Sequence, residues 1–223
     1  MSDARATAAF FDVDGTLTRT TVLHPLIWYQ KHRLSRWRFA WWFAGLCLDL
    51  PGYVLTDRRN RTDFTRRFYR RYAGLLAEDI TRFHRETLHT TFLPRLYREA
   101  PDRITWHRQQ GHRIILVSGG LDLTLQPLAE YLNADELLCT RLQQRDGRLT
   151  GELDGPPMVD EEKAQAMRRC EGINLSQSYA YADSISDLPM LRAAGNPVAV
   201  NPDGRLRKVA ERERWPIYQW HAA

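Results

Sequence analysis

The sequence predicts an α/β protein built on a parallel sheet with helices on both faces, with a helical segment inserted into it. Over residues 101–200, short apolar runs alternate with stretches of helical spacing, a pattern typical of parallel sheets covered by helices. Turns that contain acids or glycines follow the apolar runs. Between residues 18 and 101 the alternation stops, and the pattern is helical and rich in Trp, Arg and Leu.

The predicted strands are buried, because they are almost wholly apolar. Residues 7–13 end at the turn Asp14-Gly15-Thr16, and residues 112–117 end at Ser118-Gly119-Gly120. The other predicted strands are 178–182 and 197–200, and the helices of this part are 101–110, 122–132, 161–170 and 185–194. A turn at Asp146-Gly147 between two alternating runs indicates a β-hairpin within residues 141–153.

The inserted segment divides the chain into a core of residues 1–18 and 101–223 and a helical cap of residues 19–100. Hydrophobic residues at 43% and charged residues at 26% are near the averages of globular proteins, which indicates a folded enzyme and excludes disorder. From Arg19 to Glu99 there are 16 basic and 7 acidic residues, a net charge of +9, against −4 elsewhere. Such a block attracts an anionic substrate, a membrane surface or nucleic acid, or is a solvated helix face.

Cysteine usage and the first residues predict a cytoplasmic protein. Cys47, Cys139 and Cys170 form no C-x-x-C pair, which argues against a disulfide framework and a thiolate zinc site. Met1 to Ala9 contains no long apolar stretch, so we expect no signal peptide.

Two pairs of acids follow predicted strands. Asp12 and Asp14 end the first strand, and Asp183 and Asp187 follow the strand at residues 178–182. Adjacent carboxylates are costly unless a cation joins them or one is protonated, and their oxygens are the ligands that Mg²⁺ prefers. Helix capping would explain one pair alone, but two pairs at strand ends predict a magnesium site.

Groups suited to phosphate oxygens follow another strand. Ser118 offers a hydroxyl, and Gly119 offers a backbone N–H at an expected strand-to-helix turn. Lys163 lies on the predicted helix at residues 161–170, where a lysine by itself would be an ordinary surface residue.

Four motifs in order, DVDGT, the serine of LVSGG, a spaced lysine and YADSISD, resemble those of the haloacid dehalogenase superfamily. The helical insertion after the first motif resembles the cap of its phosphoserine-phosphatase-like subfamily, and the resemblance spans nearly the whole chain. It implies a Rossmann-like core and a magnesium-dependent phosphomonoester hydrolase that works through an aspartyl-phosphate.

The resemblance also implies a role for each motif residue. Asp12 would be the nucleophile, and Asp14 would protonate the leaving oxygen and later activate water, which requires a carboxyl pKa above that of a free Asp. Asp12, the Asp14 carbonyl and Asp183 would hold Mg²⁺, with Asp187 positioning metal-bound water. The residues that would neutralise the phosphoryl oxygens are Ser118, Gly119 and Lys163.

One departure leaves the substrate open. Phosphoserine phosphatases carry a cap Glu shortly after the first motif, whereas no acid occurs here between Asp14 and Asp49. We expect a small or lipid-linked phosphomonoester, with phosphoserine as an alternative. Phosphoryl transfer to an acceptor other than water and a noncatalytic, basic nucleic-acid-binding protein are further alternatives. His24, in the cap segment that relatives use for substrate contacts, is a candidate contact.

Residues 37–48 form an almost wholly apolar, Trp-rich run in the cap, with arginines nearby at 33, 36, 58, 59 and 61. About 20 apolar residues are needed to span a bilayer, and Asp49 and Pro51 interrupt this run. We expect a buried cap helix. The alternative is an interfacial helix that makes peripheral contact with the inner membrane surface.

Overall fold

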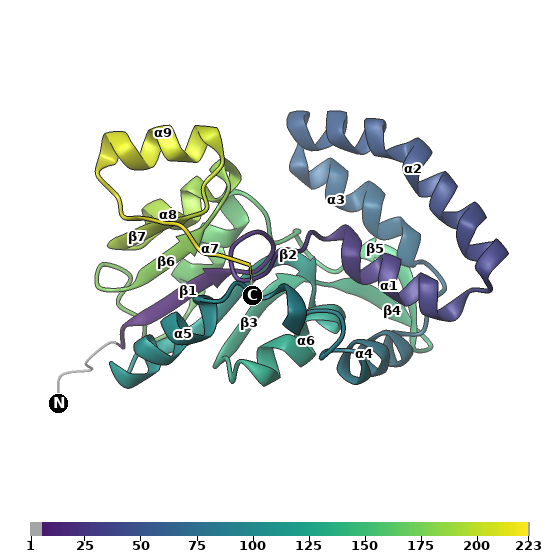
Figure 1. The fold of residues 1–223 in the computed structure, drawn as a ribbon, viewed down its shortest axis with the longest axis horizontal. Helices are drawn as coiled ribbons and strands as arrows, with labels where there is room; N and C mark the ends of the chain where they lie inside the picture. Colours follow the sequence, from purple (N-terminus) through teal and green to yellow (C-terminus); the bar gives the residue numbers. More distant parts are fainter. Residues whose placement is uncertain (1–5, 223) are drawn as a thin grey trace.

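The computed structural model describes residues 6–222, apart from the side chains at positions 54 and 57–59. Six strands form one parallel sheet in the order β3-β2-β1-β6-β7-β8 (Figure 1). They are β1 (Ala8–Asp12), β2 (Arg113–Leu121), β3 (Glu136–Thr140), β6 (Tyr179–Ala182), β7 (Asn196–Val200) and β8 (Ile217–Tyr218). Because β1 lies between β2 and β6, its carboxyl end is at the centre of one edge of the sheet.

Helices cover both faces of the sheet, which confirms the predicted fold class. The alternation of side chains along β1 separates the two faces. Phe11 packs with Ile104 and Leu128 on one face, and Phe10 packs with Met167 on the other. The covering helices are α5 (Ala100–Gln109) and α6 (Asp122–Tyr131) on the first face, and α7 (Glu161–Arg169), α8 (Leu188–Ala193) and α9 (Gly204–Glu213) on the second.

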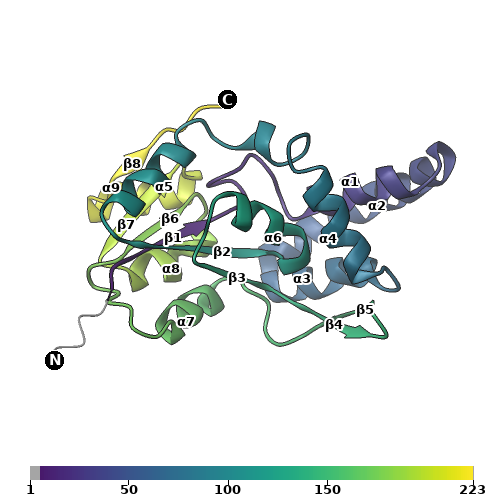
Figure 2. The same ribbon diagram turned by 90° about the horizontal axis from the view of Figure 1, so that it is seen from below.

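The segment between β1 and α5 is helical, as expected, and lies at one end of the sheet (Figures 1 and 2). Its helices are α1 (Leu23–Arg33), α2 (Arg36–Arg59), α3 (Arg61–Tyr69), η1 (Arg70–Tyr72), α4 (Ala77–Glu86) and η2 (Leu93–Arg95). All of them except η2 share an apolar cluster that includes Leu26, Tyr53 and Phe68. We keep the name cap for residues 19–100, whose boundaries remain a prediction.

The predicted hairpin exists as β4 (Leu142–Arg145) and β5 (Arg148–Leu153), and it packs against the cap. Leu142 and Leu149 belong to the apolar cluster of the cap helices. The backbone N–H of Gly74 donates to the Leu149 carbonyl at 2.8 Å, and the Leu149 N–H donates to the Leu75 carbonyl at 2.9 Å. The hairpin therefore belongs to the core by its position in the sequence, but it packs against the cap.

The turn expected at Ser118-Gly119-Gly120 is wrong, because β2 continues to Leu121 before α6 begins. The pairing of β2 with β3 shifts register between Ser118 and Leu121, so the two glycines lie in an irregular strand end. The Gly120 N–H donates to the Ser118 hydroxyl at 2.9 Å.

The Trp-rich run lies in α2, which continues through Asp49 and Pro51 to Arg59. The expected burial of this run is right for Leu46, which is 2% exposed. It is wrong for the opposite face, where Trp37 and Trp41 are 81% and 79% exposed. Of the helices in the described part of the chain, none combines the length and apolar character needed to cross a bilayer.

Candidate active site

The predicted site residues come from separate elements and meet at the carboxyl edge of the sheet. Asp12 is the last residue of β1, Ser118 lies in β2, and Asp183 directly follows β6. Asp187 ends η3 (Ile185–Asp187), and Lys163 lies in the first turn of α7. Parallel strands direct their carboxyl ends to one edge, which is why residues so far apart in sequence converge.

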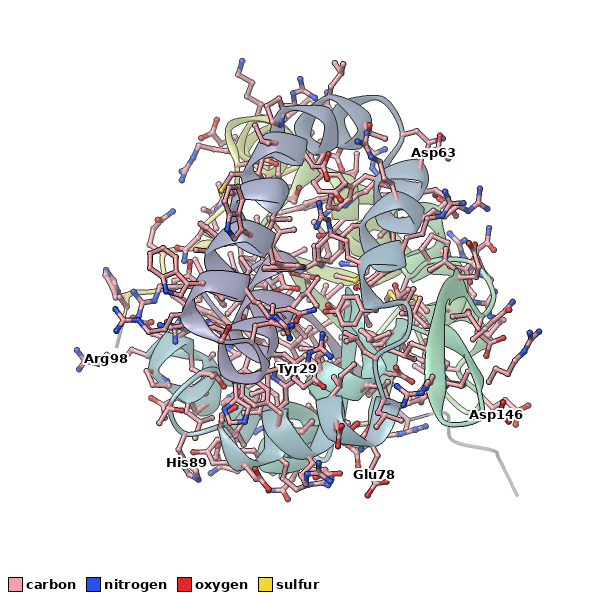
Figure 3. The ribbon with its side chains drawn as sticks, turned by 90° about the vertical axis from the view of Figure 1, so that its right-hand side faces the viewer. Tyr29, Asp63, Glu78, His89, Arg98 and Asp146 are labelled. Carbon is pink, nitrogen blue, oxygen red and sulfur yellow. The ribbon has the colours of Figure 1, made fainter. Side chains whose placement is uncertain are left out.

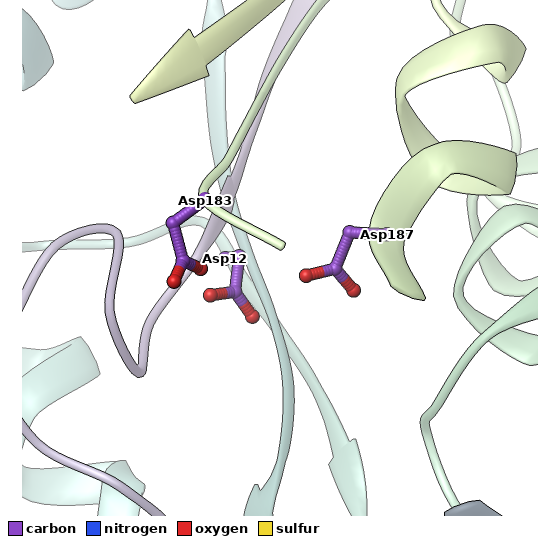
Figure 4. Close-up of side chains that lie close together, drawn as sticks. All are labelled: Asp12, Asp183 and Asp187. Atoms are coloured by element: carbon purple, nitrogen blue, oxygen red, sulfur yellow. The ribbon is translucent and has the colours of Figure 1, made fainter. Parts of the chain in front are cut away.

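Three carboxylates form the centre of the site (Figure 4). Oxygens of Asp12, Asp183 and Asp187 lie within 4.8 Å of one another. The Lys163 ammonium is 2.6 Å from Asp12 Oδ1 and 2.7 Å from Asp187 Oδ1, and these three side chains are almost fully buried. One ammonium faces three carboxylates, so the cluster has a surplus of negative charge when all of its groups are ionised.

Burial and the uncompensated negative charge of the cluster shift the pKa values of its members. Burial raises the pKa of Asp12 to about 8, opposed by the Lys163 charge and reinforced by the charges of Asp187 and Asp183. Burial and the Asp187 charge raise the pKa of Asp183 to about 6. Burial disfavours the Lys163 ammonium, but the charges of Asp12 and Asp187 outweigh it and raise the pKa of Lys163. The lysine is therefore the permanent cation of the cluster.

The donor set fits a magnesium ion. All three acids offer oxygen ligands, and a divalent cation would offset the charge that one lysine leaves uncompensated. Asp12, Asp183 and Asp187 are the residues of this cluster that would hold the ion or its water. Participation of the Asp14 carbonyl remains a prediction.

Gly15 and Thr16 shape the cluster from the turn after β1. Gly15 has φ +90°, and a Cβ there would lie 2.3 Å from Asp183 Oδ2, so a side chain is excluded at this position. The Thr16 hydroxyl lies 3.0 Å from Asp12 Oδ2 and 3.1 Å from Asp183 Oδ1 and donates toward them. Thr16 was not singled out from the sequence, although it is the last residue of the DVDGT motif.

Asp14 is half-buried and held by a threonine relay. The Thr20 hydroxyl donates to Asp14 Oδ1 at 2.5 Å, and the hydroxyls of Thr18 and Thr20 are 2.6 Å apart. Burial raises the pKa of Asp14, while the bond from Thr20 and the Lys163 charge oppose the rise. A carboxyl that is easier to protonate than a free Asp suits a proton donor near neutral pH.

A cavity of about 430 Å³ lies between the sheet edge and the cap. Its core side carries Asp12, Asp14, Ser118, Gly119, Lys163, Asp183 and Asp187. Its cap side is mainly apolar and aromatic: Val22, Leu23, Leu50, Tyr53, Phe64, Phe68 and Tyr69. Of the cap residues that line the cavity in the described structure, Arg61 carries a positive charge and none is a carboxylate.

Two cap residues that sequence reasoning missed contact the core at this cavity. The Tyr69 hydroxyl donates to the Gly119 carbonyl at 2.8 Å, and Thr140 donates to the same oxygen at 3.0 Å. Arg61 donates to the Ser186 hydroxyl. Local sequence patterns give no signal for such contacts, because they depend on how the cap is placed. His24, in contrast, accepts a bond from the Thr21 N–H through Nδ1 and does not line the cavity.

The sequence matches one family model and several known proteins. Residues 9–192 match the family model of haloacid dehalogenase-like hydrolases. The chain is 34% identical to an inhibition of morphological differentiation protein of Streptomyces azureus, over 96% of this chain and 79% of the relative. It is also 34% identical to a probable phosphatase of Mycobacterium tuberculosis, over 95% of this chain and 74% of that protein. A histidinol-phosphatase of Neisseria meningitidis is 27% identical over 94% and 96% of the two chains.

Solved structures show the same fold. A protein of unknown function from Bordetella pertussis superposes with a TM-score of 0.80 at 24% identity, covering 96% of this chain and 98% of the other. A phosphoserine phosphatase, solved as a phospho-aspartyl intermediate analogue, superposes with a TM-score of 0.68 at 21% identity, covering 96% and 93%.

Proposed function

This chain belongs to the haloacid dehalogenase-like hydrolase family and is a phosphatase, and we propose that it hydrolyses phosphomonoesters through an aspartyl-phosphate on Asp12. The observation that carries the proposal is the pairing of buried Asp12 with Lys163 beside two further acids, in a cavity that Asp14 also lines. This arrangement places a carboxylate, a fixed cation and a carboxyl of raised pKa around one space.

The proposed reaction has two displacements at phosphorus. A carboxylate oxygen of Asp12 attacks phosphorus, the bond to the ester oxygen breaks, and Asp14 gives its proton to that oxygen. Water then attacks the phosphorus, Asp14 takes a proton from the water, and the bond to Asp12 breaks to release phosphate. Lys163, Ser118 and the Gly119 N–H would neutralise the phosphoryl oxygens, which is the main catalytic contribution in phosphoryl transfer.

Mg²⁺ held by Asp12 and Asp183, with Asp187 on the ion or its water, would supply positive charge at the phosphoryl oxygens and reduce the repulsion between substrate and carboxylates. Family membership and the acidic cluster support this cofactor.

Replacing the nucleophile tests the proposal. We expect Asp12→Asn to fold like the wild type and to lose at least about 10⁴-fold in kcat on 4-nitrophenyl phosphate, since loss of a nucleophile costs up to about 10⁶ in a serine protease. The matched control is Asp102→Asn, an exposed acid on α5 that should leave kcat unchanged. Wild-type turnover by the Asp12 variant would refute the mechanism.

For the substrate, the lining of the cap favours a leaving group without an amine. A buried ammonium needs a carboxylate partner, and the described cap residues at the cavity provide none. The apolar and aromatic wall favours instead an apolar or uncharged body, which fits a small or lipid-linked phosphomonoester. The cavity volume is within the range of small-molecule sites.

A substrate panel separates this proposal from its alternatives. With Mg²⁺, we expect kcat/KM for aryl and acyl-chain phosphomonoesters to exceed that for phosphoserine by at least about tenfold, because one unpaired buried charge is worth more than 1.4 kcal/mol. A preference for phosphoserine would overturn the substrate proposal and leave the mechanism standing. Adding glycerol as acceptor and measuring glycerol phosphate distinguishes transfer from hydrolysis.

A further inference from the structure

We propose that the outer face of α2 docks on an anionic lipid surface. The feature that leads to this inference is a stripe of exposed apolar side chains, which we call the α2 stripe and which consists of Trp37, Trp41, Leu48 and Leu55. They are 81%, 79%, 83% and 52% exposed. Their spacings of four, seven and seven positions place them on one side of the helix.

The α2 stripe is long and points away from the rest of the molecule. Eighteen residues separate its ends, which corresponds to about 27 Å at 1.5 Å per residue. Two views show α2 as the outermost element at the cap end (Figures 1 and 2), and it lies toward the viewer when the molecule is seen from that side (Figure 3). The opposite face of the helix buries Leu46 and Tyr53 against the other cap helices.

The charge beside the stripe identifies the occupant. Lys31, Arg33, Arg36 and Arg38 are exposed around the start of α2, and none of them forms an ion pair with a described residue. No acid occurs from residue 15 to residue 48. Exposed tryptophans next to unpaired basic groups are suited to a bilayer interface, where the indoles enter the headgroup region and the cations meet anionic lipid.

A second copy of the chain fits the stripe less well. Parallel pairing of two stripes brings Arg36 and Arg38 of one copy against the same residues of the other, and the apolar stripe itself offers them no acid in either direction. Asp49, farther along the helix, is already bound by Arg67 and Arg71. An anionic surface, by contrast, complements the basic residues at the start of the helix.

Docking through this face would leave the catalytic cavity intact and would place it close to the lipid surface. Leu50 and Tyr53, on the inner side of the same helix, line the cavity. One helix diameter, about 10 Å, therefore separates the proposed lipid surface from the cavity.

Vesicle cosedimentation of the full chain tests the inference. The probes are phosphatidylcholine vesicles with and without phosphatidylglycerol, neither of which offers a phosphomonoester, so binding is independent of the proposed reaction. We expect binding to the anionic vesicles at low salt and loss of that binding in about 1 M salt, where the screening length falls to about 3 Å. Asp12→Asn should bind as the wild type does.

Two double variants and two controls separate the contributions. We expect Trp37→Ser/Trp41→Ser to weaken vesicle binding at least tenfold. Arg36→Ser/Arg38→Ser should weaken it by about fivefold per arginine. The controls change exposed residues off the stripe and should stay within twofold of the wild type: Tyr131→Ser, and Arg98→Ser/Arg205→Ser with the same charge loss. These four variants should keep wild-type melting and wild-type turnover of 4-nitrophenyl phosphate.

Several results would overturn the inference. These are no binding to anionic vesicles at low salt, equal weakening by stripe and control variants, or a dimer that dissociates in the tryptophan variant while vesicles are ignored. Salt-sensitive binding of a single-stranded oligonucleotide in preference to anionic vesicles would assign the stripe to nucleic acid. A protein that binds vesicles but turns over no phosphomonoester would refute only the proposed function.

Discussion

Replacing Lys163 with methionine isolates the part that fixed positive charge plays in this site. The Lys163 ammonium lies 2.6 Å from Asp12 and 2.7 Å from Asp187, and it is almost fully buried. Methionine keeps much of the aliphatic volume and removes the charge. Removing one partner from a buried ion pair costs about 3–5 kcal/mol of the free energy of unfolding. For a chain of this length that corresponds to a fall in Tm of about 6–20 °C.

The loss in stability of Lys163→Met should depend on pH. The folded pKa of Asp12, about 8, lies above its ordinary value, so this carboxyl destabilises the fold increasingly as pH rises toward 8. The Lys163 charge holds that pKa down, and without it the pKa rises further. The additional destabilisation therefore accumulates above pH 8. Melting in EDTA should show a loss that is larger at pH 9 than at pH 7 by up to about 1.4 kcal/mol, the limit for one group over one pH unit.

The catalytic consequence of Lys163→Met follows from the same charge. If the ammonium neutralises a phosphoryl oxygen, its removal should lower kcat by about 10²–10³-fold, as does loss of one oxyanion donor. Lys208→Met, at an exposed lysine on α9, is the matched control and should change neither kcat nor melting. A Lys163 variant with wild-type melting and a kcat within threefold of wild type would refute the reasoning.

Two further predictions concern Asp14 and His84. Asp14→Ala should lose about 10²–10⁴-fold with alkyl phosphates and much less with 4-nitrophenyl phosphate, whose leaving group needs little protonation; equal losses would assign Asp14 a structural or metal role. Neither nitrogen of buried His84 has a hydrogen-bond partner in the described structure, and burial lowers its pKa to about 3. The unfolded chain therefore binds the additional proton between pH 6.5 and 3, and stability falls as pH falls through this window. At pH 5 the effect is about 2 kcal/mol, so His84→Leu should melt higher than wild type by a margin that grows from pH 7 to pH 5, whereas exposed His89→Leu should show no such growth.

The sheet and the acidic cluster were predictable because each depends on a local pattern joined to one general rule. Apolar runs that end in turns identify β1, β2, β6 and β7, and parallel strands bring their carboxyl ends to one edge. That rule is sufficient to place Asp12 near Asp183. Strand β3 escaped prediction because its five residues include Glu136 and Thr140 and show no alternation. Strand β8 has two residues, too few for any periodicity.

The irregular end of β2 between Ser118 and Leu121 and the cap contacts could not be predicted from the sequence, for a different reason. A Ser-Gly-Gly sequence is compatible with a turn and with an irregular strand end, and pairing with β3 decides between them. The bond from Tyr69 to the Gly119 carbonyl depends on how two separate units pack. The local sequence around Tyr69 does not predict this contact, because Gly119 is fifty positions away in the chain.

Helix α2 shows why composition alone could not assign its faces. Residues 39–48 of this helix are apolar on every side, so this stretch has no periodicity that distinguishes an inner from an outer face. Only the packing of Leu46 and Tyr53 against the cap helices orients it, and that choice leaves Trp41 in solvent. The same choice gives the helix two separate surfaces, because Leu50 lines the cavity while Leu48, two positions earlier, is 83% exposed. Substitutions on the outer surface should therefore change binding to a lipid surface without changing turnover, and substitutions at Leu50 should do the reverse.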